Sequence, residues 1–144
     1  MIEQDTVRLL RECDAGIRMG VSSIDDVLKY VHSEELKKHL TDSKEEHEKL
    51  GRELEELLRQ YKDDGKEPSA MAKGMSWMKT NVKLMMNESD HTVADLITDG
   101  CDMGVKSLSR YLNQYGAADE ASKDLAKRLI AIEERLGVEM RDYL

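Results

Sequence analysis

The chain has 144 residues, of which 40% are apolar and 36% charged, and its net charge is −8. This length suits one domain, residues 1–144, with a substantial core, and one proline without any phenylalanine favours an all-helical protein. We expect no nucleic-acid partner, because phosphate binding needs a basic face. We also expect a cytoplasmic protein without a membrane partner, because no run of 18 apolar residues and no signal-peptide core is present. The two cysteines, Cys13 and Cys101, lack CxxC spacing and are expected to be buried free thiols.

The segment 2–32 is predicted to be the first helix. Its apolar residues recur at steps of three, four and seven, the spacing of a helix that packs in a bundle. They are Val7, Leu10, Ile17, Val21, Ile24, Leu28 and Val31. The gap between Leu10 and Ile17 is filled by Asp14, so we expect an aspartate at a core position.

A second helix is predicted over 34–64. Ser33 followed by two glutamates is an N-cap pattern, and Gly65 is a helix stop. The expected core line is Leu36, Leu40, Ser43, His47, Leu50, Leu54, Leu57 and Tyr61. His47 is therefore a polar residue in the middle of an apolar line.

A shorter connecting helix is predicted over 68–86, with a proline at its first position. Its apolar stripe is Met71, Met75, Met78, Val82 and Met85. At ~1.5 Å per residue it can carry the chain back along the bundle, so that the next helix runs parallel to the second. We expect the stripe to pack against the bundle; a partner-binding surface, or a contact between two copies in a homodimer, is the alternative.

Two further helices are predicted over 90–115 and 119–144, separated by Gly116 and with Asp119 as the cap of the last one. The expected core line of the last helix is Ser122, Ala126, Leu129, Glu133, Leu136, Met140 and Tyr143. Glu133 again places a polar residue at the centre of the line.

Two short motifs recur in the same order along the chain. CDAGIR at 13–18 matches CDMGVK at 101–106 with an offset of 88, and LGREL at 50–54 matches LGVEM at 136–140 with an offset of 86. The near-equal offsets predict a duplicated helical hairpin. The first and third core helices are then counterparts, and so are the second and fourth.

Each of the four core helices thus contributes one polar side chain near its middle: Asp14, His47, Asp102 and Glu133. Three carboxylates and a neutral imidazole could bind one divalent metal, such as Fe, Mn or Zn. The alternative is a buried network in which a protonated His47, with or without Lys44, pairs with the acids and specifies helix register. Four glycines close behind these positions are expected to leave space around the layer or to allow close helix approach: Gly16, Gly51, Gly104 and Gly137.

Two helical hairpins, a long connection and a polar layer at mid-height together resemble the ferritin-like superfamily over essentially the whole chain. The pattern is most similar to bacterial ferritin-like families without an assigned role. The resemblance implies an all-α, antiparallel four-helix bundle with an additional crossover helix. Classical members hold a di-iron centre with one carboxylate from each of the first and third core helices and Glu-x-x-His from each of the others.

By that resemblance, Asp14 and Asp102 would take the single-carboxylate positions, and His47 would take a histidine position. The chain departs from the pattern elsewhere, with Lys44 three residues before His47 and Ile130 three residues before Glu133. This degenerate ligand set favours a ferritin-like protein without catalytic residues that binds a divalent metal in its core. A metal-free helical interaction or structural module is the alternative, and a ferroxidase-type di-iron oxidase ranks third.

Overall fold

A computed structural model describes residues 2–61 and 88–144. Within these residues all regular structure is helical and no strand is present, which confirms the all-α class. The helices are α1 (Ile2–Leu28), α2 (Glu34–Gln60), α4 (Asp90–Gln114) and α5 (Glu120–Met140), followed by a 3-10 helix, η1 (Arg141–Tyr143). The predicted connecting helix 68–86, with its methionine stripe, lies outside the described residues.

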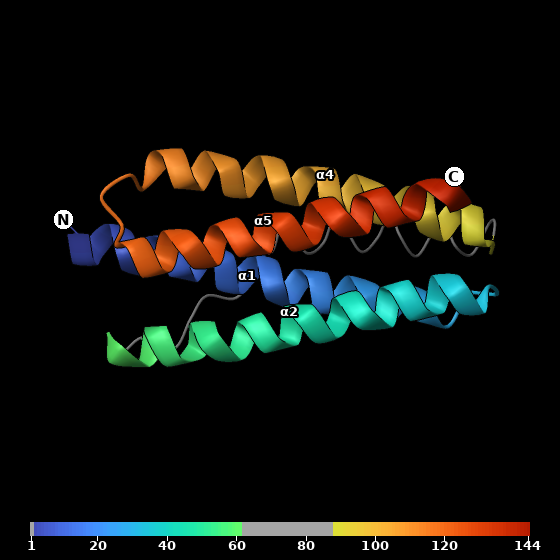
Figure 1. Cartoon of the computed structure of the whole chain (residues 1–144), viewed down its shortest axis with the longest axis horizontal. Coiled ribbons are helices and arrows are strands. Elements are labelled where there is room, and N and C mark those ends of the chain that lie inside the picture. The colour runs from blue at the N-terminus through green and yellow to red at the C-terminus, as the bar shows by residue number, and fades with distance from the viewer. Residues whose placement is uncertain (1, 62–87) are drawn as a thin grey trace.

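The four long helices lie side by side along one axis (Figure 1). α1 and α5 run in one direction, and α2 and α4 run in the other. The closest pairs are α1 with α2, α4 with α5, α2 with α5, and α1 with α4, so the helices of each of these pairs are antiparallel. α2 ends and α4 begins at opposite ends of the bundle, and these two helices run parallel, as the sequence predicts.

The first helix ends at Leu28, four residues before its predicted end. The chain turns there, and the Tyr30 N–H donates to the carbonyl of Val27 at 2.9 Å. The residue before α2 must be extended if its side chain is to reach back to the helix. Ser33 is extended (φ −73°, ψ 127°), and its hydroxyl accepts from the Leu36 N–H at 3.2 Å. Residues 29–32, which the apolar spacing alone assigned to the first helix, therefore form the connection that leads into the capped start of α2.

The second and the last of the predicted helices also extend beyond the ends that the structure gives them. α2 ends at Gln60 with Tyr61 as its C-cap, and residues 62–64 lie outside the described residues. α5 ends at Met140, where the backbone tightens into η1. The apolar line of α5 is buried as predicted, apart from Tyr143, which lies in η1 and is half-buried.

An aspartate of the second hairpin holds the loop of the first. Asp90, the first residue of α4, accepts two backbone N–H groups through its two carboxylate oxygens. The donors are His32 at 2.7 Å and Ser33 at 3.0 Å. The connection between α1 and α2 is therefore tied to the start of α4.

The opposite end of the bundle repeats this arrangement with the hairpins exchanged. Asp5 of α1 accepts the N–H of Ala117 at 3.1 Å, and the Thr6 hydroxyl accepts the N–H of Asp119 at 2.8 Å. Asp119 caps α5 as Ser33 caps α2. Each hairpin thus holds the loop of the other, which is the reciprocity expected of two halves related by a pseudo-twofold axis.

The core consists of two apolar clusters along the bundle axis. One contains Leu9, Leu10, Cys13, Ile17, Leu50, Leu54, Leu58, Leu108, Ala118, Leu125, Ala126 and Leu129. The other contains Ile24, Val27, Leu36, Leu40, Val93, Ala94, Ile97, Cys101, Leu136 and Met140. Buried polar residues of α2 and α5 lie between the two clusters in sequence: Ser43, His47 and Glu133. The core is therefore divided by a polar level.

Asp90→Ala should lower the free energy of unfolding by about 1–2 kcal/mol, because two backbone donors lose a charged acceptor. Asp99→Ala is the matched control, since Asp99 is an exposed aspartate of the same helix. Urea unfolding followed by circular dichroism measures both. Equal effects of the two substitutions would show that the loop contact does not stabilise the fold.

Candidate functional site

His47 of α2 and Glu133 of α5 meet in the centre of the bundle. Nε2 of His47 lies 2.8 Å from Oε1 of Glu133, and the two residues are only 1% and 8% exposed. Their separation in sequence is 86 residues, which equals the offset between the LGREL and LGVEM motifs. His47 and Glu133 therefore hold corresponding places in the two stretches that these motifs align, three residues before each motif.

The other ring nitrogen of His47 determines where the proton lies. Nδ1 is 2.7 Å from the backbone carbonyl oxygen of Ser43, and a carbonyl only accepts, so Nδ1 carries a hydrogen. The contact between Nε2 and Glu133 then needs one more proton, either on the imidazole or on the carboxyl. The pair thus holds a single shared proton and has no net charge.

The balance of interactions favours the protonated form of the imidazole. Burial lowers the pKa of His47, but the hydrogen bond to Glu133, the negative charge of Glu133 and the Ser43 carbonyl together outweigh it. The net result is a pKa above the usual 6.5. His47 and Glu133 therefore form an imidazolium–carboxylate ion pair in the core.

Two glycines lie directly over this pair. A Cβ on Gly20 of α1 would be 2.9 Å from both Cδ2 and Nε2 of His47, and one on Gly104 of α4 would be 3.4 Å from Cδ of Glu133. The predicted role of glycine in leaving space for the polar level is thus seen at Gly104. Gly20 has the same role, although it was not among the predicted glycines. Its position in a helix interior, one turn beyond Gly16, is the sequence feature that could have indicated this role.

The other three predicted glycines face apolar side chains instead. A Cβ on Gly51 would be 3.3 Å from Cγ2 of Ile17, and one on Gly137 would be 3.6 Å from Cβ of Cys101. A Cβ on Gly16 would make ordinary contact with a leucine of α5. These glycines serve close helix approach, which is the second of the two predicted roles.

Both cysteines are buried free thiols, as predicted. Burial, followed by the charge of Glu133 and a hydrogen bond to it, raises the pKa of Cys101 far above its usual value. Burial, with smaller effects of Glu12 and Asp14, raises the pKa of Cys13 to about 12. Because the thiolate is the reactive form of cysteine, burial keeps both thiols in the less reactive, protonated form. The contact of Cys101 with the pair was not predicted.

Asp102 does not lie in the core, so its predicted position is wrong. Its side chain is exposed, whereas the residue before it, Cys101, is buried. The buried line of α4 contains Ile97, Cys101 and Leu108, and the next residue along a helix points about 100° away. The repeated motif aligns Asp102 with Asp14 in sequence, but α4 presents a different face to its neighbours.

Asp14 is buried, at 3% exposure, as predicted, but it lies at a different height from the pair. Gly20 is the residue of α1 level with His47, and Asp14 is six residues earlier, which is ~9 Å along the axis. Oδ2 of Asp14 pairs with Nε of Arg18 at 3.2 Å. Asp14 lines an open groove of about 430 Å³ between α1 and α2, together with Gly51 and other residues of both helices.

The four predicted ligands therefore do not converge on one point. Within residues 2–61 and 88–144, no group of three or more His, Cys, Asp or Glu side chains could hold a metal ion. Both ring nitrogens of His47 already face acceptors. Lys44 takes no part in the central pair, because its Nζ binds Oδ1 of Asp25 at 2.6 Å. The residues fit a two-membered ion pair and not the metal site that the sequence suggested.

Comparison of the chain with protein-family models, with curated proteins and with solved structures returned no match. In the described part of the chain, no helix has the length and hydropathy needed to cross a bilayer. The function is therefore argued from the geometry of the bundle.

Gly20→Ala should lower the free energy of unfolding by roughly 1–3 kcal/mol, because the new methyl group would displace the buried imidazole of His47. Gly100→Ala is the matched control, since a Cβ there meets nothing within 4 Å. It should stabilise the protein by up to about 1 kcal/mol through helix propensity. Thermal and urea unfolding report both changes. Stabilisation by Gly20→Ala would show that the pair is not packed against α1.

The raised pKa of His47 predicts that the protein loses stability as the pH rises. The stabilisation is fully present below the unfolded-state value of about 6.5 and is lost as the pH rises through the higher folded value. The steepest loss is about 1.4 kcal/mol per pH unit, the slope for one proton. Unfolding free energies between pH 6 and 9 should therefore fall faster in the wild type than in the non-titrating double variant His47→Leu/Glu133→Met. Parallel curves would contradict this assignment of the proton.

Proposed function

We propose that this chain is a non-catalytic, ferritin-like helical bundle that acts through its surface as a structural or protein-interaction module. The observation that carries the proposal is the closed central pair. Both nitrogens of His47 and an oxygen of Glu133 are engaged with each other or with the backbone. Within residues 2–61 and 88–144, the two ionisable side chains of this level are thus engaged with each other, and the neighbouring thiol of Cys101 is held protonated.

The ferritin-like part of the proposal is supported by the order and direction of the helices. Two antiparallel hairpins lie side by side, and α2 and α4 are parallel, with the end of α2 and the start of α4 at opposite ends of the bundle (Figure 1). A single long crossover is the connection that distinguishes ferritin-like bundles from simple up-and-down ones. The reciprocal loop contacts of Asp5 and Asp90 add the pseudo-twofold relation.

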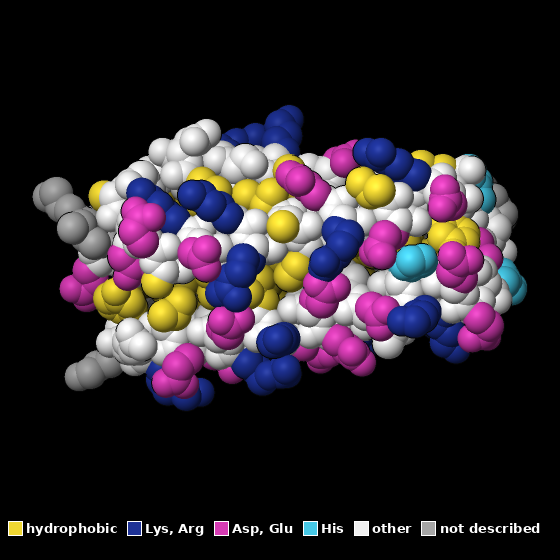
Figure 2. All heavy atoms as spheres, viewed as in Figure 1, with side chains coloured by type: hydrophobic (Ala, Val, Ile, Leu, Met, Phe, Trp, Pro, Cys, Tyr) yellow, Lys and Arg dark blue, Asp and Glu magenta, His cyan; other side chains and the backbone are white. Residues whose placement is uncertain are grey.

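The interaction part is supported by the surface. On the face that α2 and α5 share, basic and acidic side chains alternate along the bundle, with apolar side chains between them (Figure 2). The rim of a protein interface is polar in this way, whereas its core is depleted of charged residues, so the apolar side chains between the charges are the part that a partner would cover. The large hydrophobic residues most exposed in the described part of the chain are Met103, Val138 and Leu144. The partner of such a module is another protein or a second copy of this chain.

A divalent metal at this level would have to replace the proton between His47 and Glu133. It would find two side-chain ligands there, whereas structural and catalytic sites use three or four. Asp14 lies about two turns away along α1, and Asp102 faces outward. A di-iron oxidase needs still more carboxylates than these. The ion pair is the arrangement that these residues satisfy without any addition.

Elemental analysis of protein purified without an affinity tag or chelator tests the proposal. We expect less than stoichiometric Fe, Mn and Zn, and an unfolding midpoint that a chelator does not change. Near-stoichiometric metal that disappears in His47→Ala would overturn it.

The double variant His47→Leu/Glu133→Met provides the complementary control. Replacing a buried ion pair by apolar residues of similar volume is often neutral or stabilising. We therefore expect a folded protein that retains the oligomeric state and the co-purifying partners of the wild type. Loss of those partners, with the fold intact, would show that the core and not the surface carries the function.

A further inference from the structure

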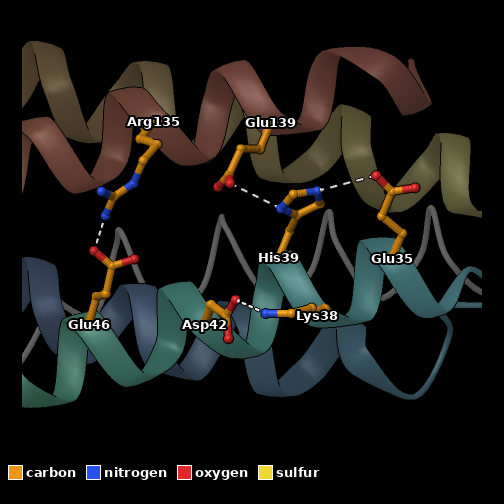
Figure 3. Close-up of polar contacts among 7 residues, drawn as sticks. All are labelled: Glu35, Lys38, His39, Asp42, Glu46, Arg135 and Glu139. Carbon is orange, nitrogen blue, oxygen red and sulfur yellow. Dashed lines mark hydrogen bonds and ion pairs between the residues drawn. The ribbon is translucent and has the colours of Figure 1, made fainter.

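The charged side chains drawn in Figure 3, on the face that α2 and α5 share, have partners within the chain. Glu46 of α2 pairs with Arg135 of α5. Lys38 donates to Asp42 of the same helix at 2.7 Å. A second protein that meets these charges has to compete with pairs that are already made.

The charges on the outer side of α4 differ in this respect. Asp99, Lys106 and Arg110 are exposed, and none of the three forms a hydrogen bond or an ion pair with the described part of the chain. Lys106 and Arg110 are four residues apart, a spacing at which like charges repel each other along a helix. The helix dipole favours charges only in the first and last turns, whereas Asp99 and Lys106 lie in the interior of α4. Neither pairing within the described bundle nor the dipole therefore accounts for these charges.

The three charges share one stripe of α4 with an exposed methionine. The steps along this stripe are four, three and four, which place its members on one side of the helix: Asp99, Met103, Lys106 and Arg110. This side points away from the core, because Met103 lies two residues, or about 200°, beyond the buried Cys101. Met103 is 63% exposed. The Met103 stripe is thus acidic before its apolar residue and basic after it.

This order of charges is complementary to itself when the helix is reversed. In a twofold dimer, residue i of one copy contacts residue j of the other, and j contacts i. With two antiparallel α4 helices and the axis at Met103, Asp99 comes level with residue 107 of the other copy. Lys106 and Arg110 of that copy lie one and three residues away, which is at most ~4.5 Å along the helix. Each acid of the stripe therefore meets two bases, and the same contacts occur twice.

We propose that the Met103 stripe is a self-association surface and that its partner is a second copy of this chain. Two α4 helices pack antiparallel across a twofold axis at Met103, and Asp99 of each copy pairs with Lys106 and Arg110 of the other. A second copy satisfies the stripe without any further requirement, because the complementary charges are already part of the same helix. The inference rests on the proposed function and deepens it by naming the partner and the surface.

Sedimentation equilibrium of the full chain tests for the dimer. The contact is one helix wide, and small polar interfaces are weak, so we expect monomer at about 10 µM and a growing dimer fraction toward about 1 mM. Salt should oppose the dimer, because exposed charge pairs are screened. We expect at least fivefold weaker dimerisation at about 0.5 M than at about 0.05 M salt. A chain that stays monomeric at the highest concentration would overturn the proposal.

Two charge reversals give the sharper test. Asp99→Lys makes the stripe wholly basic, and Lys106→Glu puts an acid opposite Asp99 of the other copy. Each variant alone should dimerise at least tenfold more weakly than the wild type. An equimolar mixture should regain wild-type affinity, because each reversed charge then meets its opposite. Lys127→Glu is the matched control, since it makes the same change of charge at an exposed position of α5 and should dimerise like the wild type.

A cysteine at the centre of the stripe locates the axis. Two thiols form a disulfide only when their Cα atoms approach within about 7 Å, and the two native cysteines are buried. Met103→Cys should therefore form a linked dimer at least tenfold faster than Ser109→Cys, an exposed position of α4 outside the stripe. Equal rates would reject an axis at Met103.

The outcomes separate this inference from the proposed function. A dimer that neither charge reversal weakens, or a mixture that does not restore it, would assign self-association to another surface and reject the stripe. The elemental analysis of the core would be unaffected by either result, so a metal-free protein could still act through its surface. Stoichiometric metal lost in His47→Ala would overturn the proposed function even if the charge reversals behaved as expected.

Discussion

The burial of two ionisable side chains at the same height is the constraint on which this bundle depends. A charge taken out of water is tolerated in a protein interior only when a partner of opposite charge and hydrogen bonds replace the solvent. His47 and Glu133 are such partners for each other, and the Ser43 carbonyl accepts a hydrogen bond from the second ring nitrogen of His47. A shift of α2 against α5 by one helical turn would leave both groups without a partner. The pair therefore sets the height of one hairpin relative to the other.

The rest of the core is arranged around that level. Gly20 and Gly104 leave the volume that the imidazole and the carboxylate occupy, and one apolar cluster lies on each side. A buried ion pair seldom adds much net stability, but it excludes alternatives in which its members are unpaired. The outer pairs, Glu53 with Arg128 and Glu46 with Arg135, add contacts between α2 and α5. They share one polarity at heptad spacing, so a slip of one heptad would still bring a glutamate onto an arginine, and the central pair alone opposes it.

The separation of His47 and Glu133, 86 residues, matches the offset of one pair of repeated motifs. In two related halves, a residue near the pseudo-twofold axis meets its own counterpart, and identical acids or identical histidines there would repel each other. A histidine in one half and a glutamate in the other turn that repulsion into attraction. The loop contacts of Asp5 and Asp90 give the two ends of the bundle a similar arrangement.

The sequence by itself determined the four long helices of the described residues, their approximate limits, and most of the core lines of α2 and α5, including His47 and Glu133. In the last turn of α2 the spacing predicted Leu57 in the core, whereas the structure buries Leu58. These features depend on local spacing and on caps such as Ser33 and Asp119, which are properties of one helix. The tertiary structure alone decided which polar residues share a level. Asp14 and Asp102 match in sequence, yet one is about two turns from His47 and the other faces solvent. The rotation and height of α1 and α4 come from packing against two or three neighbours, and a pattern read along one chain contains no measure of them.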